Sequence, residues 1–240
     1  MTVFQYDTGI LKRYPTIVGG VILAQGMTNG PTPKDLQAAF IDEQLATLQR
    51  IGATPLSQIP SLAAWRAVFR SFGVDPTQYR SAAEALLRRL TKKGDIPGIN
   101  LLVDLGNLVS IRYALPVAVF DTSSLNGAIT VHVADGSERY TTLGQEELEH
   151  PEPGEVVFSD ATKLVIARRW CWRQSDQSAA QQETTQAIIT VEAHHTQGKV
   201  DVDAALDDLL TLLRTYAGGN FIYSRLDATN PIISDASEPF

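Results

Sequence analysis

The sequence predicts an α+β protein, in which helices and strands are segregated along the chain. Helix-like patterns run from residue 33 to residue 113, strand-like patterns follow from 117 to 193, and one amphipathic segment closes the series. Because strands do not alternate with helices, the chain lacks the repeated βαβ units of a parallel sheet. A content of 44% hydrophobic and 20% charged residues over 240 positions is typical of a globular protein.

The first part of the chain, residues 1–60, predicts one buried strand followed by one helix. Residues 19–25 form a glycine-led apolar run, which is typical of a buried strand. Thr32 is placed to cap a helix whose first turn contains Pro33, where a missing N–H has no cost. An apolar stripe continues to Gly52, which ends the helix.

Three further helices are predicted after this portion. Residues 61–72 have their aromatic side chains on one face. Ser81 and Glu84 form a capping box before a short helix that ends at Gly94. Residues 99–113 have the apolar spacing of a buried helix, with Ile99 as its first apolar position.

Short strands are predicted next, separated by turns rich in Gly, Asn, Asp and Pro. They cover residues 117–121, 128–133, 139–143, 155–160, 164–172 and 184–193. Leucines on one face predict a closing helix at 201–214, within residues 196–217. Residues 218–240 are interpreted as a loop-like tail that frays over its last residues, SDASEPF. No Pro/Gly/Ser-rich linker interrupts these patterns, so we expect a single domain over residues 1–240.

Composition and charge exclude several classes of protein. Cys171 is the one cysteine, and no Cys/His cluster has zinc-site spacing, so we expect no metal and no cofactor. The N-terminus lacks the pattern of a signal peptide, and no apolar run approaches the roughly 20 residues that cross a bilayer. These observations predict a cytoplasmic protein without membrane contact. The net charge of −7 argues against general nucleic-acid binding but leaves room for a local basic patch.

Polar side chains recur on one face of the helix predicted at 99–113. Asn100, Asp104 and Asn107 follow helical spacing within an apolar segment. Buried polar groups need hydrogen-bond partners, so these side chains either cap neighbouring loops or face a wet pocket. The sequence leaves both interpretations open.

The segment RRWCWRQSD, residues 168–176, interleaves cationic and aromatic side chains. Strand alternation sorts them onto two faces, with Arg169, Cys171 and Arg173 on one and Arg168, Trp170 and Trp172 on the other. Such a strand can stack a base or hold a phosphate or carboxylate. In the alternative interpretation, the tryptophans belong to the core and the arginines extend to solvent.

The histidines do not indicate a catalytic or metal site. His194 and His195 are adjacent on a predicted strand, so they point to opposite faces and cannot bind one metal together. His132 lies in the middle of a predicted strand, where we expect a structural role. The chain also lacks the glycine-rich phosphate loops and the nucleophile elbow of common enzyme classes.

Residues 97–138 resemble the B3/B4 domain, the editing domain, of the bacterial phenylalanyl-tRNA synthetase beta subunit. The shared positions are Pro97, Asn100, Val103, Asp104, Asn107, Pro116, Phe120, Asp121 and Gly127. Later matches are Asp160, Lys163, a threonine at 184 or 185, and Glu192. Free-standing members of the family are similar through W-R-x-x-x-R-x-F-G, S-x-E-A-L-L-R-R and R-R-W-x-W-R-Q-S, found here at 65–73, 81–89 and 168–175.

The resemblance spans residues 62–192 and implies a three-layer α+β fold with a β-sandwich-like core at 61–195. It also implies a pocket between the Asn100 helix and the end of the strand at 168–175. In the synthetase, this domain hydrolyses tyrosine that is wrongly attached to phenylalanine tRNA. The implied partners are therefore the acceptor end of a tRNA and its aminoacyl group.

Two departures from the family pattern affect the predicted chemistry. The family's histidine before F-D falls at Ala118, and its G-G-E segment falls at residues 172–174. An imidazole and a carboxylate are therefore replaced, and two glycines give way to bulky side chains. Specificity for tyrosine does not carry over.

The leading hypothesis is a hydrolase that acts in trans on mischarged aminoacyl-tRNA through positioning and oxyanion donors. Asn100 and Gln174 are its expected catalytic residues. The expected substrate-binding residues are Asp104, Asn107, Ala118, Trp172, Arg173 and Ser175, and the expected RNA-binding residues are Arg88, Arg89, Arg168 and Arg169. The alternatives are a binding module for an amino acid or acceptor end, and an interaction protein with a vestigial pocket.

Overall fold

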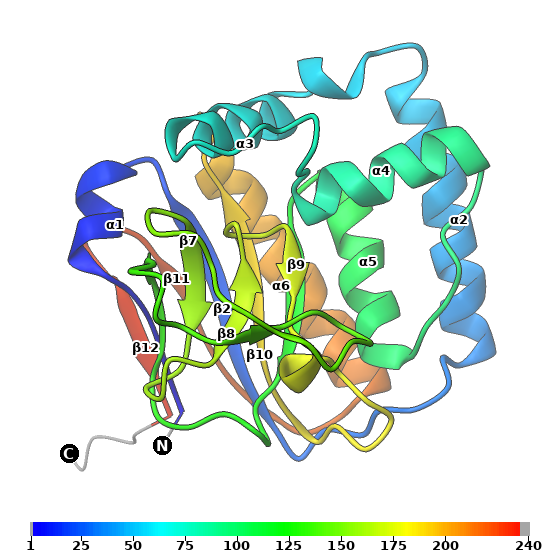
Figure 1. Cartoon of the computed structure of the whole chain (residues 1–240). Coiled ribbons are helices and arrows are strands. Elements are labelled where there is room, and N and C mark those ends of the chain that lie inside the picture. Colours follow the sequence, from blue (N-terminus) through cyan, green and yellow to red (C-terminus); the bar gives the residue numbers. More distant parts are fainter. Residues whose placement is uncertain (1, 236–240) are drawn as a thin grey trace.

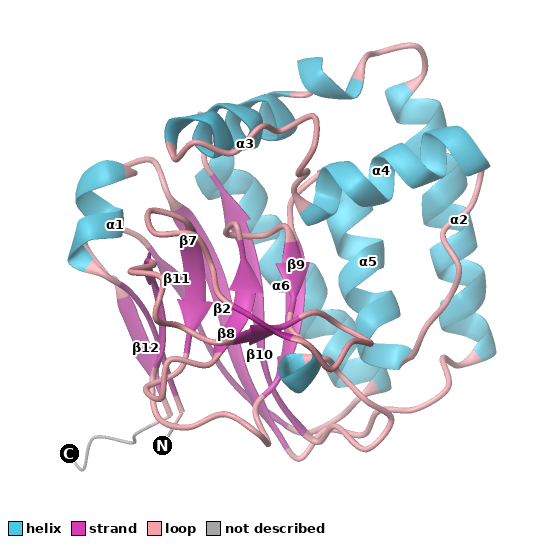
Figure 2. Cartoon of the chain, viewed as in Figure 1, coloured by secondary structure: helices cyan, strands magenta, loops and turns pink. Residues whose placement is uncertain are grey.

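Two stacked sheets and one layer of helices build the protein, as Figures 1 and 2 show. The computed structural model describes residues 2–235. The outer sheet, sheet A, contains in spatial order β12 (Ile232–Ser234), β1 (Val3–Tyr6), β4 (Ile129–Val133), β7 (Val156–Ser159), β8 (Val165–Arg168) and β9 (Arg173–Gln174). Its neighbours are antiparallel except for β1 and β4, which run parallel.

The central sheet, sheet B, is fully antiparallel. It contains in spatial order β11 (Asn220–Leu226), β2 (Val18–Gln25), β10 (Gln186–Ala193) and β3 (Val117–Asp121). A small separate ribbon pairs β5 (Tyr140–Thr141) with β6 (Leu148–Glu149).

The helical layer covers the face of sheet B that points away from sheet A. Two helices, α5 (Leu101–Tyr113) and α6 (Gly198–Tyr216), pack directly on its strands, and α2 (Lys34–Ile51) and α4 (Ala82–Lys93) pack against α5. The remaining helices, α1 (Thr8–Arg13) and α3 (Pro60–Ser71), supply apolar side chains to the core between the two sheets. Short 3-10 turns lie at Leu56–Gln58 and Asp176–Ser178.

Sheet B separates two hydrophobic cores, and its strand alternation explains why. On β10, Ile189 and Val191 pack against the helices, whereas Ile188 packs against sheet A. The helices, sheet B and sheet A are thus the three layers expected from the sequence, and the α+β fold class is confirmed.

The prediction of a loop-like tail from residue 218 is wrong, because the strands β11 and β12 lie within it. Gly218 and Gly219 both have positive φ and turn the chain from α6 into β11. Residues 236–240, part of the segment predicted to fray, lie outside the described residues. The strand and helix before residue 18, β1 and α1, are absent from the prediction.

The single strand predicted at 164–172 is also wrong. β8 ends at Arg168, and the next two residues, Arg169 and Trp170, take positive φ values of 45° and 61°. A left-handed turn of two non-glycine residues breaks the alternation of side chains, and the chain returns as β9.

Candidate functional site

A cavity of about 140 Å³ lies where α5 meets the edge strand of sheet B. Its walls come from α5 (Val103, Gly106 and Asn107), β3, β10 (Thr190 and Glu192), β8 (Ala167) and residues 170–174, which follow β8. Gly106 faces Val117 and Val119 of β3 across the cavity wall, where a Cβ would make ordinary van der Waals contact at 3.4 and 3.5 Å.

Five residues predicted from the sequence line this cavity: Asn107, Ala118, Trp172, Arg173 and Gln174. Gln174 donates from its side-chain amide nitrogen to the backbone oxygens of Val119, at 2.8 Å, and Ser178. Its carbonyl oxygen accepts no hydrogen bond within residues 2–235, and the amide of Asn107 has no partner there either. Both residues can therefore offer polar atoms to a ligand.

Three other predicted residues lie outside the cavity wall. Asn100 caps α5, accepting from the Val103 N–H at 3.1 Å and donating to the Ala180 carbonyl at 3.0 Å. Asp104 accepts from the Ile99 N–H at 2.8 Å and from the Thr32 hydroxyl at 2.5 Å. These two side chains cap loops, the first of the two interpretations above.

The third residue outside the wall is Ser175, and the loops nearby also differ from the sequence prediction. Ser175 is fully buried and its hydroxyl lies 3.0 Å from that of Ser178. Thr32 does not cap α2, whose N-cap is Pro33, because its hydroxyl is bound to Asp104. Ile99 is 68% exposed instead of buried, because α5 begins only at Leu101.

Two polar cavity residues are absent from the predicted set, Thr190 and Glu192 on β10. Glu192 is 2% exposed, and its Oε1 accepts from the Tyr6 hydroxyl at 2.7 Å and from the Trp170 indole N–H at 3.1 Å. Burial raises the pKa of Glu192 to about 7, and these two hydrogen bonds act in the opposite direction. The sequence signal is a glutamate within the apolar strand, on the face opposite Ile189 and Val191.

Arg168 is committed to an internal ion pair. Its guanidinium binds both carboxylate oxygens of Glu155, at 2.9 and 3.0 Å, and one of Glu149 at 2.8 Å, and the residue is 4% exposed. The expectation that Arg168 contacts RNA is therefore not supported by its position, since β8 turns this side chain into the protein.

A basic groove of about 450 Å³ adjoins the cavity and shares Trp172 and Arg173 with it. Its cationic residues are Arg80, Arg88, Arg89, Lys92, Lys93 and Arg173. The four cationic side chains that α4 supplies are exposed, because they lie on the polar face of this amphipathic helix. We refer to these six residues as the basic groove.

Aromatic side chains accompany the cations at the junction of groove and cavity. The Arg169 guanidinium lies 3.9 Å from the ring centre of Tyr79 and 4.5 Å from that of Trp172. Arg173 stacks on Trp172 at 4.8 Å. This arrangement suits contact with a nucleotide base or a phosphate.

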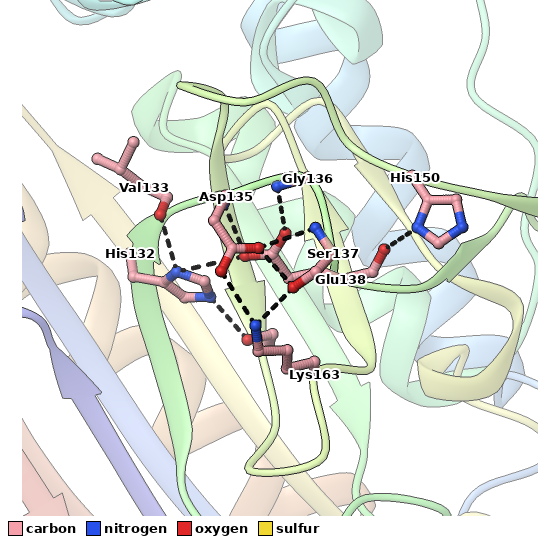
Figure 3. Close-up of polar contacts among 9 residues, drawn as sticks. His132, Val133, Asp135, Gly136, Ser137, Glu138, His150 and Lys163 are labelled. Atoms are coloured by element: carbon pink, nitrogen blue, oxygen red, sulfur yellow. Dashed lines mark hydrogen bonds and ion pairs between the residues drawn. The ribbon is translucent and has the colours of Figure 1, made fainter.

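The histidines of the described residues lie outside the cavity wall. His132 is held on sheet A, where its Nε2 lies 2.7 Å from the Ser159 hydroxyl and its Nδ1 lies 3.1 Å from the Val133 carbonyl. Figure 3 shows His132 beside Glu138, Asp135 and Lys163. Within residues 2–235, no cluster of His, Cys, Asp and Glu side chains is arranged to bind a metal ion.

Comparison with known proteins assigns the chain to a family. The sequence model of the B3/4 domain matches residues 64–218, and the chain belongs to this family. The matched region contains α5, β3, β8, β10 and the segment after β8, so it includes every residue of the cavity wall named above.

Curated relatives are beta subunits of phenylalanine--tRNA ligase. The Staphylococcus saprophyticus subunit is 29% identical over 167 residues, which cover 60% of this chain and 20% of that subunit. The Shewanella oneidensis subunit is 28% identical over 110 residues, 46% of this chain and 13% of its own. The chain thus spans a fifth or less of the length of these relatives.

Among solved structures, an N-terminal fragment of the phenylalanyl-tRNA synthetase beta-subunit from Pyrococcus horikoshii is similar. The similarity covers 93% of this chain and 54% of the fragment, with 11% identity and a TM-score of 0.47. No helix within residues 2–235 combines the length and the hydropathy needed to span a bilayer.

Proposed function

We propose that this protein hydrolyses mischarged aminoacyl-tRNA in trans. The observation that carries the proposal is the junction between the cavity and the basic groove. The cavity offers unpaired polar atoms in an apolar enclosure, and the groove offers exposed cations at its mouth. An aminoacylated acceptor end has the matching parts, an amino acid joined to a phosphate-bearing strand.

In the proposed mechanism, the cavity positions the ester and the attacking water by hydrogen bonds, and no histidine acts as the base. The Asn107 amide can donate to the oxygen that becomes negatively charged, and the Gln174 carbonyl can accept from a water or from the amino group. No histidine lies in the cavity wall within residues 2–235. Asn107 takes the role that the sequence assigns to Asn100, whose side chain instead fixes the start of α5.

The basic groove supports the nucleic-acid part of the proposal. Arg88, Arg89, Lys92 and Lys93 project from one end of α4 beside Arg173. Their charges lie on a protein whose net charge is −7, so we expect phosphate to contact this surface in preference to the acidic remainder. Trp172 lines both groove and cavity and is backed by Arg169 at 4.5 Å, and we expect the terminal adenine of a tRNA to pack at this ring.

The first prediction concerns Asn107→Ala. Loss of one preorganised donor to the oxyanion typically lowers the rate by about 10²-fold or more. We expect a loss of that size in single-turnover deacylation across a panel of mischarged tRNAs. Asn220→Ala is the matched control, because Asn220 is an exposed residue of β11 outside the cavity, and it should retain full activity.

The competing function is a binding module, and the same panel distinguishes it. In that case the unaltered protein binds aminoacyl-tRNA but releases no free amino acid, and Asn107→Ala weakens the binding. This result would show that the protein recognises aminoacyl-tRNA without hydrolysing it. Neither binding nor release with any tRNA of the panel would contradict both functions. His132→Ala should leave any deacylase activity within a few-fold, because its side chain lies outside the cavity.

A further inference from the structure

A second pocket, of about 390 Å³, adjoins the basic groove and shares no lining residue with the cavity. It lies between α3, α4 and the connection from α2 to α3, of which residues 51–57 contribute (Figure 1). Three of its lining residues, Arg80, Arg88 and Lys92, also belong to the groove. The cavity, the groove and this pocket are therefore contiguous. We refer to the pocket as the arginine pocket.

The wall of the arginine pocket carries a surplus of positive charge. Its cations are Arg66, Arg80, Arg88 and Lys92, and its one carboxylate is Glu84, which leaves three positive charges uncompensated. A concave surface lined mainly by one sign of charge concentrates the electric field within it. The arginine pocket is therefore suited to an anion.

Glu84 holds two of the arginines in place. It is 5% exposed, and its Oε1 accepts from Nη1 of Arg66 at 2.6 Å and lies 3.8 Å from Nε of Arg80. Nη1 of Arg66 also donates to the Pro76 carbonyl at 3.2 Å. The other N–H groups of Arg66, and the terminal N–H groups of Arg80, donate to no protein atom within residues 2–235. These oriented donors are available to a phosphate, which arginine binds well.

Arg88 and Lys92 complete the pocket from α4. They are exposed, lie four residues apart on one face of the helix, and form no ion pair within residues 2–235. Like charges at this spacing repel one another. A bound anion offsets the repulsion, and these two side chains stand where the pocket meets the groove.

The charge and the position of the pocket favour a terminal phosphate. A phosphate inside an RNA strand carries one negative charge, whereas a phosphate monoester carries about two at neutral pH. In a tRNA, the 5′ end is paired beside the unpaired strand that ends in the aminoacyl group. A 3′ end that reaches the cavity past the groove therefore brings the 5′ phosphate to the same side of the protein.

We propose that the arginine pocket binds the 5′-terminal phosphate of the RNA whose 3′ end enters the cavity. Arg66 and Arg80 bind its oxygens, and Arg88 and Lys92 contact the strand where pocket and groove meet. The inference rests on the proposed function for the identity of the RNA. It gives the protein a contact with each end of the acceptor stem, and an RNA extended at its 5′ end presents only a diester there.

Ser57 allows the charge of the pocket to be changed without altering the pair of Arg66 and Glu84. It is an exposed residue of the pocket wall. Ser57→Asp adds a carboxylate to the wall, and Ser57→Asn, which has the same shape without the charge, is the matched control. A second comparison is Arg89→Gln/Lys93→Gln, which removes two cations that belong to the groove alone.

The test measures the affinity of an acceptor-end RNA hairpin, labelled away from its 5′ end, by fluorescence anisotropy. The hairpin carries a 5′ phosphate, a 5′ hydroxyl or an additional 5′ nucleotide. We expect the 5′ phosphate to bind about ten-fold more tightly than the other two, because charge-assisted hydrogen bonds to arginine are strong. A terminal phosphate without effect on affinity would overturn the inference.

The variants then locate the effect. In Ser57→Asp the preference for the 5′ phosphate should fall to within about two-fold, because like charges then face each other. Ser57→Asn should keep the preference. Arg89→Gln/Lys93→Gln should weaken binding of every hairpin and keep the ratio between them. A preference that survives in Ser57→Asp, or that disappears in the groove variant alone, would place the terminal phosphate outside the pocket and overturn the inference.

Adenosine 5′-monophosphate distinguishes the end of an RNA from a free nucleotide with the same phosphate chemistry. We expect it to compete weakly with the 5′-phosphorylated hairpin and not with the 5′-hydroxyl hairpin. Tight binding of the mononucleotide that Ser57→Asp removes, together with equal affinity for all hairpins, would make the pocket a nucleotide site and overturn the assignment to RNA.

The outcomes also separate this inference from the proposed function. The hairpins carry no amino acid, so the preference is measured without ester hydrolysis. A preference for the 5′ phosphate without deacylation of any mischarged tRNA leaves the inference standing and removes hydrolysis. Deacylation with equal affinity for all hairpins does the reverse. Absence of binding by every hairpin, without deacylation, would overturn both.

Discussion

Two ionisable side chains at one end of β10 have pKa values displaced in opposite directions. Burial raises the pKa of Glu192 to about 7. Burial, with a contribution from His195, lowers the pKa of His194 to about 3. His194 lies among aromatic rings, with those of Trp65 and Trp170 centred 4.6 and 5.0 Å away. Both groups favour their neutral forms in the folded protein.

The pH dependence of stability should reveal Glu192. Between pH about 4.5 and about 7, the native state holds a proton on Glu192 that the unfolded chain has released. Stability due to this group therefore falls as pH rises through that window, by about 3 kcal/mol in total. We expect the free energy of unfolding of the wild type, relative to Glu192→Gln, to decrease from about pH 5 to about pH 8 in urea titrations.

His194 contributes with the opposite sign. Below pH about 6.5, His194 becomes protonated in the unfolded chain, whereas in the native state it stays neutral down to about pH 3. The stability that neutral His194 contributes is therefore lost as pH falls through this range. The two effects partly cancel in the wild type, which is why the comparison uses a variant. Glu146→Gln, at an exposed position, is the control. A curve for Glu192→Gln parallel to that of the wild type would contradict the assignment.

The C-terminal end of α5 carries a residue in an unfavourable backbone conformation. Ala114 caps the helix with φ 52° and ψ 39°, in the left-handed region. That region costs an L-residue about 1–2 kcal/mol, and glycine enters it freely. The same helix forms one wall of the cavity, so a change at its C-terminal end affects an element of the site.

Ala114→Gly should therefore raise the free energy of unfolding by about 0.5–1 kcal/mol, the relief of strain less the greater chain entropy of glycine. The matched control is Ala85→Gly at an exposed position in α4. There glycine should lower stability by about 1 kcal/mol. Chemical unfolding measures both, and two equal losses would show that the conformation at Ala114 carries no strain.

Helices and strands that are specified by neighbouring residues could be predicted from the sequence. The helices α2 to α6 have apolar positions at helical spacing, Ser81 and Gly94 mark the two ends of α4, and most strands after residue 117 are bounded by turn residues. The edge strand β12 could not be placed in this way, because its pairing with β1 depends on a contact across the whole chain. The left-handed turn at Arg169 and Trp170 contains no glycine, the residue that usually indicates such a turn in a sequence, so it could not be predicted.

The same reasoning applies to the candidate site. Asn107 and Gln174 could be predicted because the resemblance marks both segments that form the wall. Asn100 shares the spacing of Asn107 but lies at the helix start, where its side chain is used as a cap. The resemblance also marks Glu192, but its place in the cavity wall needs tertiary structure, because its environment is created by Tyr6 and Trp170 from distant segments.

At the scale of the whole molecule, charge is unevenly distributed. The protein carries a net charge of −7, whereas one groove gathers six cationic residues. Binding of an acceptor-end RNA hairpin should therefore weaken steeply with salt, because each phosphate contact releases a condensed counterion.

The double variant Arg88→Ala/Lys92→Ala should reduce the slope of log Kd against log salt by about 2, one unit for each lost contact. Fluorescence anisotropy between about 50 and about 200 mM salt gives this slope. Lys12→Ala/Lys34→Ala removes the same charge from exposed positions outside the groove and should leave the slope unchanged. Equal slopes for both double variants would show that RNA does not use the groove.

The two ends of the described chain are joined through sheet A. Val3 pairs with Ser234 on antiparallel strands, and Thr2 and Asp235 exchange hydrogen bonds beyond them. A force that separates these ends would act across the β1–β12 ladder and open its hydrogen bonds one after another. Such unzipping resists tension less than shearing, in which all bonds of a ladder are loaded together. Under a pull from its ends, the molecule would therefore yield first between β1 and β12. Tyr6 lies on β1 and donates to Glu192 of the cavity, so loss of β1 would also remove this contact.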